Sequence, residues 1–341
     1  MFGKTLTEII RDRDVLFISP SDVNYIRNKQ EIEILKIAAR GVSIIAPANT
    51  HSVSPTGIKR ILGIVLRVLF AKTSKYDVVF VAGIPQTILP FVHFLFKRRI
   101  IIIDFFISLY DTLVSDRQIL APGNPMSSLL RMLDRHTLKL ADHVIVDTRE
   151  HASYFSKFFG MDAGKMEVIY LEPDRDIYYP RKVERPENLR CKFIAFFFGA
   201  MNPLQGVEVI LEAARMLQEH QGIEFVFVGP HEKIAGIEKY SELPNIRFAA
   251  RWLPQDSVAD YIARSDVCLA GHFNADIPKA SRVIPGKAYS YLAMDKPVIL
   301  GDNPANRELF TVGQQNIHFV RMGDPEALAN RILQLAAKRR G

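Results

Sequence analysis

Residues 270–302 combine cations, a proline and a helix start in an order that suits phosphate binding. The segment reads AGHFNADIPKASRVIPGKAYSYLAMDKPVILGD, and its polar loop contains Lys279 and Arg282. Pro285 follows at the place expected for the first helical residue, and Lys287 comes two residues later. Proline suits that place because its missing N–H would have no intrahelical partner. First-turn N–H groups and the helix dipole attract anions. The segment therefore predicts a phosphate site, with a solvated basic loop as the alternative.

The elements that must position this site form a parallel α/β layer. Apolar strands are expected at residues 267–270 and 297–300, with the helix between them. Val/Ile runs without polar alternation, such as residues 99–104, indicate strands that are covered on both faces of a parallel sheet. Ligands of such sheets bind beyond the carboxyl ends of the strands. We therefore predict an α/β fold with two Rossmann-like, doubly wound parallel-sheet domains that face each other across a cleft.

Length and composition divide the chain into two domains. At 341 residues it exceeds one ordinary domain and fits two. Residues 171–189 are charged, contain prolines and lack an apolar period, which predicts a linker. The expected boundaries are residues 1–172 for the N-terminal domain, 173–190 for the linker and 191–341 for the C-terminal domain.

Apolar periodicity predicts the individual elements. Ser21 or Asp22 is expected to cap the first helix after Pro20, and Asp256 or Ser257 is expected to cap a helix of the C-terminal domain. Residues 105–124 are expected to form a loop. The strands are expected at residues 14–19, 42–46, 76–81, 99–104, 143–147, 166–170, 192–198, 224–228, 246–250, 267–270 and 297–300. Further helices are expected at residues 57–71, 86–96, 125–140, 149–159, 204–220, 256–264 and 325–340.

Composition excludes several classes of protein. An apolar share of 48% with 24% charged residues is typical of globular proteins. Cys191 and Cys268 lie in apolar runs, so we expect core residues of a reducing compartment and neither a disulfide nor a zinc site. The N-terminus lacks the apolar segment of a signal peptide, and cations interrupt residues 87–109, so no membrane span is expected. A cytoplasmic protein is predicted.

The net charge of +7 is concentrated in one segment. Residues 55–140 contain twelve Lys or Arg against five Asp or Glu, an excess as large as that of the whole chain. Such a segment favours an anionic membrane surface or an anionic acceptor, and no recognition motif supports nucleic acid. Within it, residues 57–71 predict an apolar helix flanked by cations. This helix can pack on the sheet or lie on a membrane surface, and both interpretations stay open.

Four segments resemble bacterial glycosyltransferases of the GT-B fold, in the group called glycosyltransferase family 4 or group 1. They read DFFISLYDTLVSDR, LADHVIVDTREHASYF, FFFGAMNPLQGVEVILEA and RVIPGKAYSYLAMDKPVILGDNPANREL. The resemblance extends over residues 14–337. It implies that the C-terminal domain binds most of a nucleotide-sugar donor and that the N-terminal domain binds the acceptor. It also implies that no metal or other cofactor is needed, because helix dipoles and basic side chains neutralise the leaving diphosphate.

This resemblance and the phosphate site together give candidate roles to individual residues. Asp104 or Asp111 is the catalytic candidate near the reacting sugar or acceptor hydroxyl, although Asp111 can equally cap a turn. In the two-glutamate pattern of the family, Arg282 and Ser290 occupy the glutamate positions, and a serine reaches one ribose hydroxyl at best. The acceptor-side candidates are Asn24, Ser108 and Arg117. The donor-binding candidates are Gly199, Asn202, Gln205, Arg251, His272, Lys279, Arg282, Pro285, Lys287 and Ser290.

Some of these residues have a second interpretation. Asp147 and Thr148 are expected to cap the following helix rather than to catalyse. Trp252 is expected in the core, with a place beside the nucleotide base as the alternative. His272 and Lys279 can contact either the donor or solvent.

Together these observations predict a cytoplasmic glycosyltransferase that uses a nucleotide sugar and, by family analogy, retains the anomeric configuration. We expect it to act in cell-surface polysaccharide or glycolipid assembly, on a lipid-linked or polysaccharide acceptor, as a peripheral protein of the inner face of the plasma membrane. One alternative is a transferase for a soluble small-molecule or protein acceptor. Another is a partner protein of the same fold without turnover, which Ser290, Gln205 and Met201 suggest.

Overall fold

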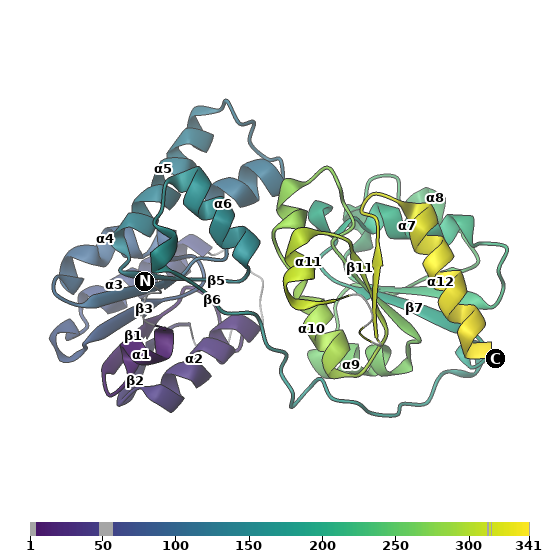
Figure 1. Ribbon diagram of the computed structural model, residues 1–341, viewed down its shortest axis with the longest axis horizontal. Helices are drawn as coiled ribbons and strands as arrows, with labels where there is room; N and C mark the ends of the chain where they lie inside the picture. The colour runs from purple at the N-terminus through teal and green to yellow at the C-terminus, as the bar shows by residue number, and fades with distance from the viewer. Residues whose placement is uncertain (1–4, 48–56, 312–313, 315, 341) are drawn as a thin grey trace. The chain divides into compact units, whose positions relative to one another are not determined.

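The chain folds into two compact units, each built around its own parallel sheet (Figure 1). The computed structural model describes residues 5–47, 57–311, 314 and 316–340. Unit 1 comprises Met1–Glu172 and unit 2 comprises Pro173–Gly341. Within the described residues each sheet has six strands, and all neighbouring strands are parallel. The prediction of two doubly wound parallel sheets is confirmed.

Unit 1 has the strand order β2-β1-β3-β4-β5-β6. Alternate strand residues point to opposite faces, so each apolar strand contributes to two cores. Helices α1 and α2 cover one face, and α3 to α6 cover the other (Figure 1). The strands are β1 (Asp14–Ile18), β2 (Gly41–Ile45), β3 (Val78–Val81), β4 (Ile100–Asp104), β5 (His143–Val146) and β6 (Met166–Val168). The helices are α1 (Leu6–Ile10), α2 (Ile26–Ala38), α3 (Gly57–Leu69), α4 (Leu89–Val92), α5 (Pro125–Leu140) and α6 (Arg149–Phe159).

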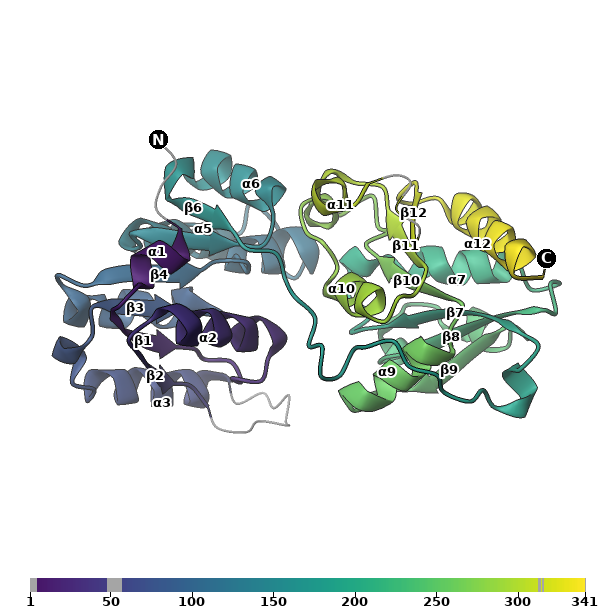
Figure 2. The ribbon, with the colours of Figure 1, turned by 60° about the horizontal axis from the view of Figure 1, so that its bottom comes forward.

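Unit 2 has the strand order β12-β11-β10-β7-β8-β9. Helices α7 and α12 pack on one face, while α9 and α10 cover the other (Figure 2). The strands are β7 (Phe193–Phe198), β8 (Ile223–Val228), β9 (Ile246–Ala250), β10 (Val267–Gly271), β11 (Val298–Gly301) and β12 (Ile317–Val320). The helices are α7 (Val207–Met216), α8 (Glu238–Ser241), α9 (Gln255–Arg264), α10 (Gly286–Ala293), α11 (Pro304–Leu309) and α12 (Pro325–Arg340).

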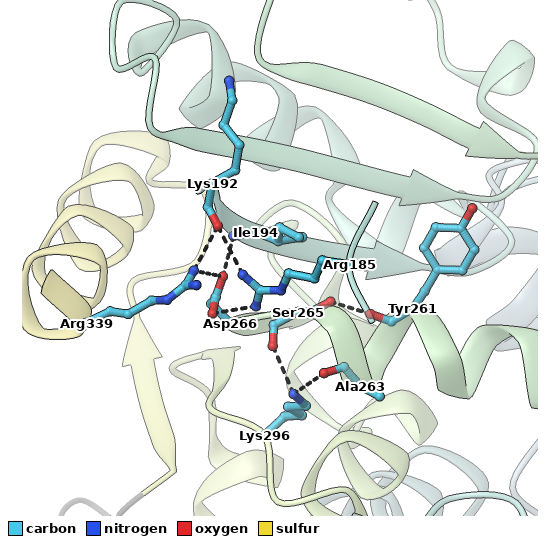
Figure 3. A network of polar contacts seen from close by, with 9 residues as sticks. All are labelled: Arg185, Lys192, Ile194, Tyr261, Ala263, Ser265, Asp266, Lys296 and Arg339. Carbon is cyan, nitrogen blue, oxygen red and sulfur yellow. Dashed lines mark hydrogen bonds and ion pairs between the residues drawn. The ribbon is translucent and has the colours of Figure 1, made fainter. Parts of the chain in front are cut away.

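Asp266 ties three segments of unit 2 together (Figure 3). Its carboxylate accepts hydrogen bonds from Arg185 Nη2 at 2.7 Å, from Arg339 Nη1 at 2.6 Å and from the N–H of Ile194 at 2.8 Å. Arg185 lies in the segment predicted as a linker, Arg339 lies in α12 and Ile194 lies in β7. A single half-buried carboxylate therefore anchors the connecting segment and the C-terminal helix to the amino end of a central strand.

Three predicted helices coincide with the structure from end to end, namely α5, α6 and α12. The prediction that Thr148 caps α6 is confirmed, because its side chain accepts a hydrogen bond from the N–H of His151. Three elements were not predicted: α1, α11 and β12. They are short, with four to six residues, so their apolar period is barely expressed.

Several predicted boundaries and caps were wrong. The side chains of Ser21 and Asp22 do not cap α2, which begins at Ile26 after Tyr25, and Pro254 precedes α9 where Asp256 or Ser257 was expected to cap it. The helix expected at residues 86–96 is divided into the 3-10 turn Pro85–Thr87, α4 and the 3-10 turn His93–Phe96. Two prolines, Pro85 and Pro90, interrupt its N–H donors.

One loop, one helix start and the burial of one cysteine also differ from the prediction. Residues 105–124 contain a π-helical turn, Asp111–Asp116, rather than only loop. The helix expected at residues 204–220 begins later, at Val207, because Gly206 adopts φ 63° and closes a preceding 3-10 turn. Cys191 is exposed and is not a core residue, whereas Cys268 is buried as predicted.

Candidate functional site

The carboxyl edge of the unit 2 sheet has a point where the order of strands reverses. β7 lies beside β10, although two strands and three α-helices separate them in the chain. Loops 199–206 and 272–285 leave these adjacent strands. Connections that run in opposite directions from neighbouring strands leave an open place above the sheet, where ligands of such folds bind. The segment predicted to bind phosphate is therefore located at this point.

The two loops pack tightly against each other. The N–H of Phe273 donates to the carbonyl of Gln205 at 3.1 Å, and Asn274 Nδ2 donates to the carbonyl of Pro203 at 3.0 Å. Gly206 makes this approach possible, because a Cβ there would lie 2.5 Å from the backbone nitrogen of Asn274. Apolar side chains below the loops form a small core of Leu204, Ile277, Ala280 and Val283. The loop conformation is thus set by backbone contacts and a core of its own.

Helix α10 begins at the end of the second loop. Pro285 is the N-cap, with φ −61° and ψ 123°, and Gly286 is the first helical residue. The prediction that Pro285 is itself the first helical residue was wrong by one position, because its ψ is extended. Proline offers no side-chain oxygen to the N–H groups of the first turn, so those of Gly286 and Lys287 stay available to a ligand.

The amine of Lys287 lies inside this edge of the unit. Its side chain is 8% exposed, and no hydrogen-bond acceptor for Nζ exists among the residues that the structure describes. The amine lies over the ring of Phe197, 4.1 Å from its centroid. Burial lowers the pKa of Lys287 to about 7. A buried amine without a partner, on the first turn of a helix, is the arrangement that an incoming phosphate group would complete.

Gly199 and Gln205 stand next to this amine. A Cβ on Gly199 would lie 3.0 Å from both Lys287 Nζ and Gln205 Nε2. The buried Oε1 of Gln205 has no hydrogen-bond partner among the described residues. These three donor-binding candidates, which are far apart in the sequence, therefore converge on one small volume.

The other donor-binding candidates fall into two groups. His272 and Lys279 are buried, Arg282 is half-buried, and all three lie on the loop that leads to α10. Asn202 lies half-buried at the start of the 3-10 turn Pro203–Gln205. Arg251 is not part of this group, because it is 67% exposed beyond β9 and pairs with Glu232 at 2.9 Å.

Trp252 and Ser290 differ from what the sequence suggested. Trp252 is 61% exposed, so its expected place in the core was wrong. Ser290 is 4% exposed and forms a side-chain hydrogen bond with Tyr178, whose pKa burial raises to about 12. The serine at the position of the family's second glutamate thus holds the segment that enters unit 2. Sequence patterns gave no signal for this contact.

In unit 1, Asp104 is enclosed by a buried ionic cluster. Asp104 is fully buried, and its two oxygens accept from Arg27 Nη2 at 3.1 Å and from Arg27 Nε at 3.3 Å. Glu31 lies 3.3 Å from the same guanidinium. Burial raises the pKa of Glu31 well above its usual range, and the neighbouring Asp104 adds to the rise. Burial beside the Arg27–Asp104 pair therefore disfavours the charged form of the Glu31 carboxyl.

The remaining unit 1 candidates lie in two segments, Asn24 after β1 and the other three, Ser108, Asp111 and Arg117, after β4. Asp111 and Ser108 are fully buried, and the Ser108 hydroxyl donates to Asp134 Oδ2 at 2.7 Å. Asn24 and Arg117 are exposed. The structure thus encloses both catalytic candidates and leaves two of the acceptor-side candidates at the surface.

Sequence reasoning missed two pairs of ionisable side chains at the carboxyl edge of unit 1. Arg27 and Glu31 are spaced i, i+4 on α2, and the pair Asp147 and His151 has the same spacing, with Asp147 Oδ1 2.7 Å from His151 Nδ1. This spacing on a helix was the available signal. Within the described residues, no group of three or more His, Cys, Asp or Glu side chains could hold a metal ion. No helix in the same residues is long and apolar enough to cross a bilayer.

Two Rossmann-like units, one with a lysine-bearing helix start at a strand-order reversal, form an architecture that suits nucleotide binding and is typical of GT-B transferases. Family models support this class over both units. Residues 16–172 match the description "Glycosyl transferase 4-like domain", and residues 192–338 match "Glycosyl transferases group 1". The chain belongs to the group 1 glycosyltransferases, and it is a glycosyltransferase enzyme.

Solved structures agree with this fold. A sucrose-phosphate synthase from Thermosynechococcus elongatus superposes with a TM-score of 0.65 at 14% identity, covering 95% of this chain and 90% of that one. The structure of HepE from Anabaena in complex with UDP superposes with a TM-score of 0.62 at 16% identity, covering 96% of this chain and 90% of that one. A glycosyltransferase from Rickettsia africae superposes with a TM-score of 0.61 at 14% identity, covering 96% of this chain and 88% of that one. No curated protein matches the chain.

Proposed function

We propose that this glycosyltransferase takes its sugar from a nucleotide-sugar donor whose diphosphate binds at the start of α10. The observation that carries the proposal is the buried, unpartnered amine of Lys287 beside the free N–H groups of Gly286 and Lys287. An amine with a pKa near 7 gains a proton readily when an anion arrives. HepE, which is similar in fold, was solved with UDP and with UDP-glucose, so a uridine nucleotide is the first donor to test.

The chemistry follows from where charge develops. When the bond between the sugar and the diphosphate breaks, negative charge grows on the departing phosphate. Lys287 and the first-turn N–H groups are fixed by α10 and its packing on Phe197, so a phosphate bound there would need little reorganisation of them. Gln205 lies beside this amine, and its amide can donate a neutral hydrogen bond to the same phosphate. Retention of the anomeric configuration is proposed by analogy with the family.

Unit 1 would bind the acceptor. Asn24 and Arg117 are the surface candidates for contacting it. A direct role for Asp104 or Asp111 would require their side chains to become accessible, because both are fully buried. We propose a lipid-linked or polysaccharide acceptor in cell-surface assembly at the inner face of the plasma membrane, since the basic excess of residues 55–140 suits an anionic surface.

Calorimetric titration of nucleotide sugars with different bases tests the donor site. At least one should bind the wild-type chain, and Lys287→Met should weaken it about 30- to 1000-fold, equivalent to roughly 2–4 kcal/mol. Lys338→Met is the matched control, because this lysine lies exposed on α12 and should bind like the wild type. Equal affinity for Lys287→Met and wild type would contradict the site, and no binding of any nucleotide sugar would contradict the proposed donor.

A further inference from the structure

Helix α3 has two apolar faces, and the fold uses only one of them. Ile64 and Val68 are buried in the core of unit 1. The opposite side carries an outer stripe, defined as Ile58, Leu62, Leu66, Leu69 and Phe70, with exposed fractions of 82%, 56%, 45%, 39% and 88%. Their spacing of four, four, three and one residues keeps them on one side of the helix. Nothing within the described part of the chain covers this stripe.

The next helical segment extends the same apolar surface. α4 contacts α3, and both insert into one core, through Val92 and Val68 respectively. On the outside, Phe91 is 60% exposed and Phe94, in the following 3-10 turn, is 56% exposed. We call the outer stripe together with these two rings the outer apolar surface. Clusters of exposed large apolar side chains on this scale mark a binding surface rather than ordinary protein surface.

Cations accompany the outer apolar surface with little compensation. Lys59, Lys72, Lys97 and Arg98 are exposed within or beside its segments. Acidic residues do not balance them at the surface. Of the five in residues 57–140, the four at Asp104, Asp111, Asp116 and Asp134 are buried. The fold therefore places the positive charges of this segment outside and most of its negative charges inside.

We propose that the outer apolar surface docks unit 1 on an anionic lipid bilayer. The apolar side chains would enter the boundary between headgroups and acyl chains, while the surrounding lysines contact lipid phosphates. A protein partner fits less well, because lysine is depleted in protein interfaces. This inference rests on the membrane location proposed above and specifies which surface makes the contact. It does not depend on the donor site, which lies in unit 2.

Co-sedimentation of the full chain with vesicles tests the docking. Phosphatidylcholine vesicles that contain phosphatidylglycerol should bind the protein at low salt, and vesicles of phosphatidylcholine alone should bind it weakly. The double variant Leu62→Gln, Phe70→Ser should bind anionic vesicles at least about tenfold more weakly, because it removes apolar area from the inserted face. The variant Lys97→Glu should bind anionic vesicles about fivefold more weakly or worse, since one basic residue near an anionic surface raises the affinity by about a factor of five.

Ile37→Gln is the matched control. Ile37 is 87% exposed on α2, which covers the opposite face of the sheet, so this variant should bind like the wild type. Calorimetric unfolding of every variant shows whether unit 1 is still folded, and nucleotide titration separates a failure of docking from a failure of the donor site. Absence of the wild type from the anionic vesicle pellet would overturn the proposal. So would unchanged binding of the double variant, because attraction would then be electrostatic only, without insertion.

Discussion

At the scale of single residues, the environment of Lys287 opposes its own charge. The amine is 8% exposed and lies against an aromatic ring, without a carboxylate to pair with. An apolar side chain of similar size would avoid the cost of burying it. The proposed phosphate ligand would explain a residue that weakens the folded state in this way.

The pH dependence of nucleotide binding follows from this amine. A diphosphate favours the protonated form, and the pKa of Lys287 in the free protein is about 7. The affinity for the nucleotide should therefore be highest below pH 7. Above pH 7 it should decrease by up to about tenfold for each pH unit. Titrations between about pH 6.5 and 8.5 measure this slope. The Lys287→Met variant should show no such slope, and an equal slope in both proteins would assign the proton to another group.

At the scale of elements, α2 is held to the sheet mainly by polar contacts. Arg27 Nη1 donates to the carbonyl of Ile169 at 2.5 Å, and Gln30 Nε2 donates to that of Tyr170 at 2.9 Å. Asn28 Nδ2 donates to Ser19 Oγ at 3.1 Å. The helix thus joins the carboxyl ends of β1 and β4 with the end of β6, using a buried face that is largely charged or amide-bearing.

The buried cluster around Arg27 leads us to expect different effects of replacing its two acids, Asp104 and Glu31. Asp104→Asn should destabilise unit 1 by about 3–5 kcal/mol, because the buried Arg27 charge loses its partner. Glu31→Gln should not destabilise unit 1 at pH 7, since the raised pKa of this carboxyl means that the fold disfavours its charged form. Chemical unfolding measured by circular dichroism compares the two variants.

The effect of Glu31 on the free energy of unfolding can be tested by measuring stability at several pH values. The raised pKa means that the folded protein binds a proton above pH 4.5 that the unfolded chain has lost, so this group weakens the fold as pH rises from there. Glu31→Gln removes that slope and should gain stability relative to wild type toward neutral pH. A loss of several kcal/mol at pH 7 would instead show that the carboxylate is charged in the fold.

At the scale of the whole molecule, each unit has its own core and its own candidate ligand. The residues that we propose for the donor site belong to β7, β10, α10 and their loops in unit 2. The outer apolar surface is built entirely from unit 1. Donor binding and membrane docking are therefore separable by mutation.

Thermal unfolding should reveal that separation. Trp252 is the single tryptophan and lies in unit 2, so its fluorescence reports on that unit. A nucleoside diphosphate at a hundredfold excess over its Kd should stabilise this transition by about 2.7 kcal/mol. Calorimetry should show the unit 1 transition unchanged. An equal shift of both transitions would show that the nucleotide is shared between the units.

Much of the fold could be read from local patterns. Uninterrupted Val/Ile runs and helical spacing gave most of the strands and the full extents of α5, α6 and α12, because these signals depend on neighbours in the chain. The cationic loop, Pro285 and Lys287 likewise indicated an anion site at α10, since a helix start and its cations are local. Family membership followed from the same segments.

Burial and partners were decided only by tertiary structure. The sequence could not show that Asp104 is enclosed with Arg27, 77 residues away, or that Ser290 bonds Tyr178. It also left open whether the second apolar face of α3 is covered, which the exposure of Leu62 and Phe70 answers. Strand order brings distant loops together, and it thereby decides which charged side chains are buried and which stay exposed to solvent. This is why the chemistry of Lys287 is a property of the folded unit and not of its segment alone.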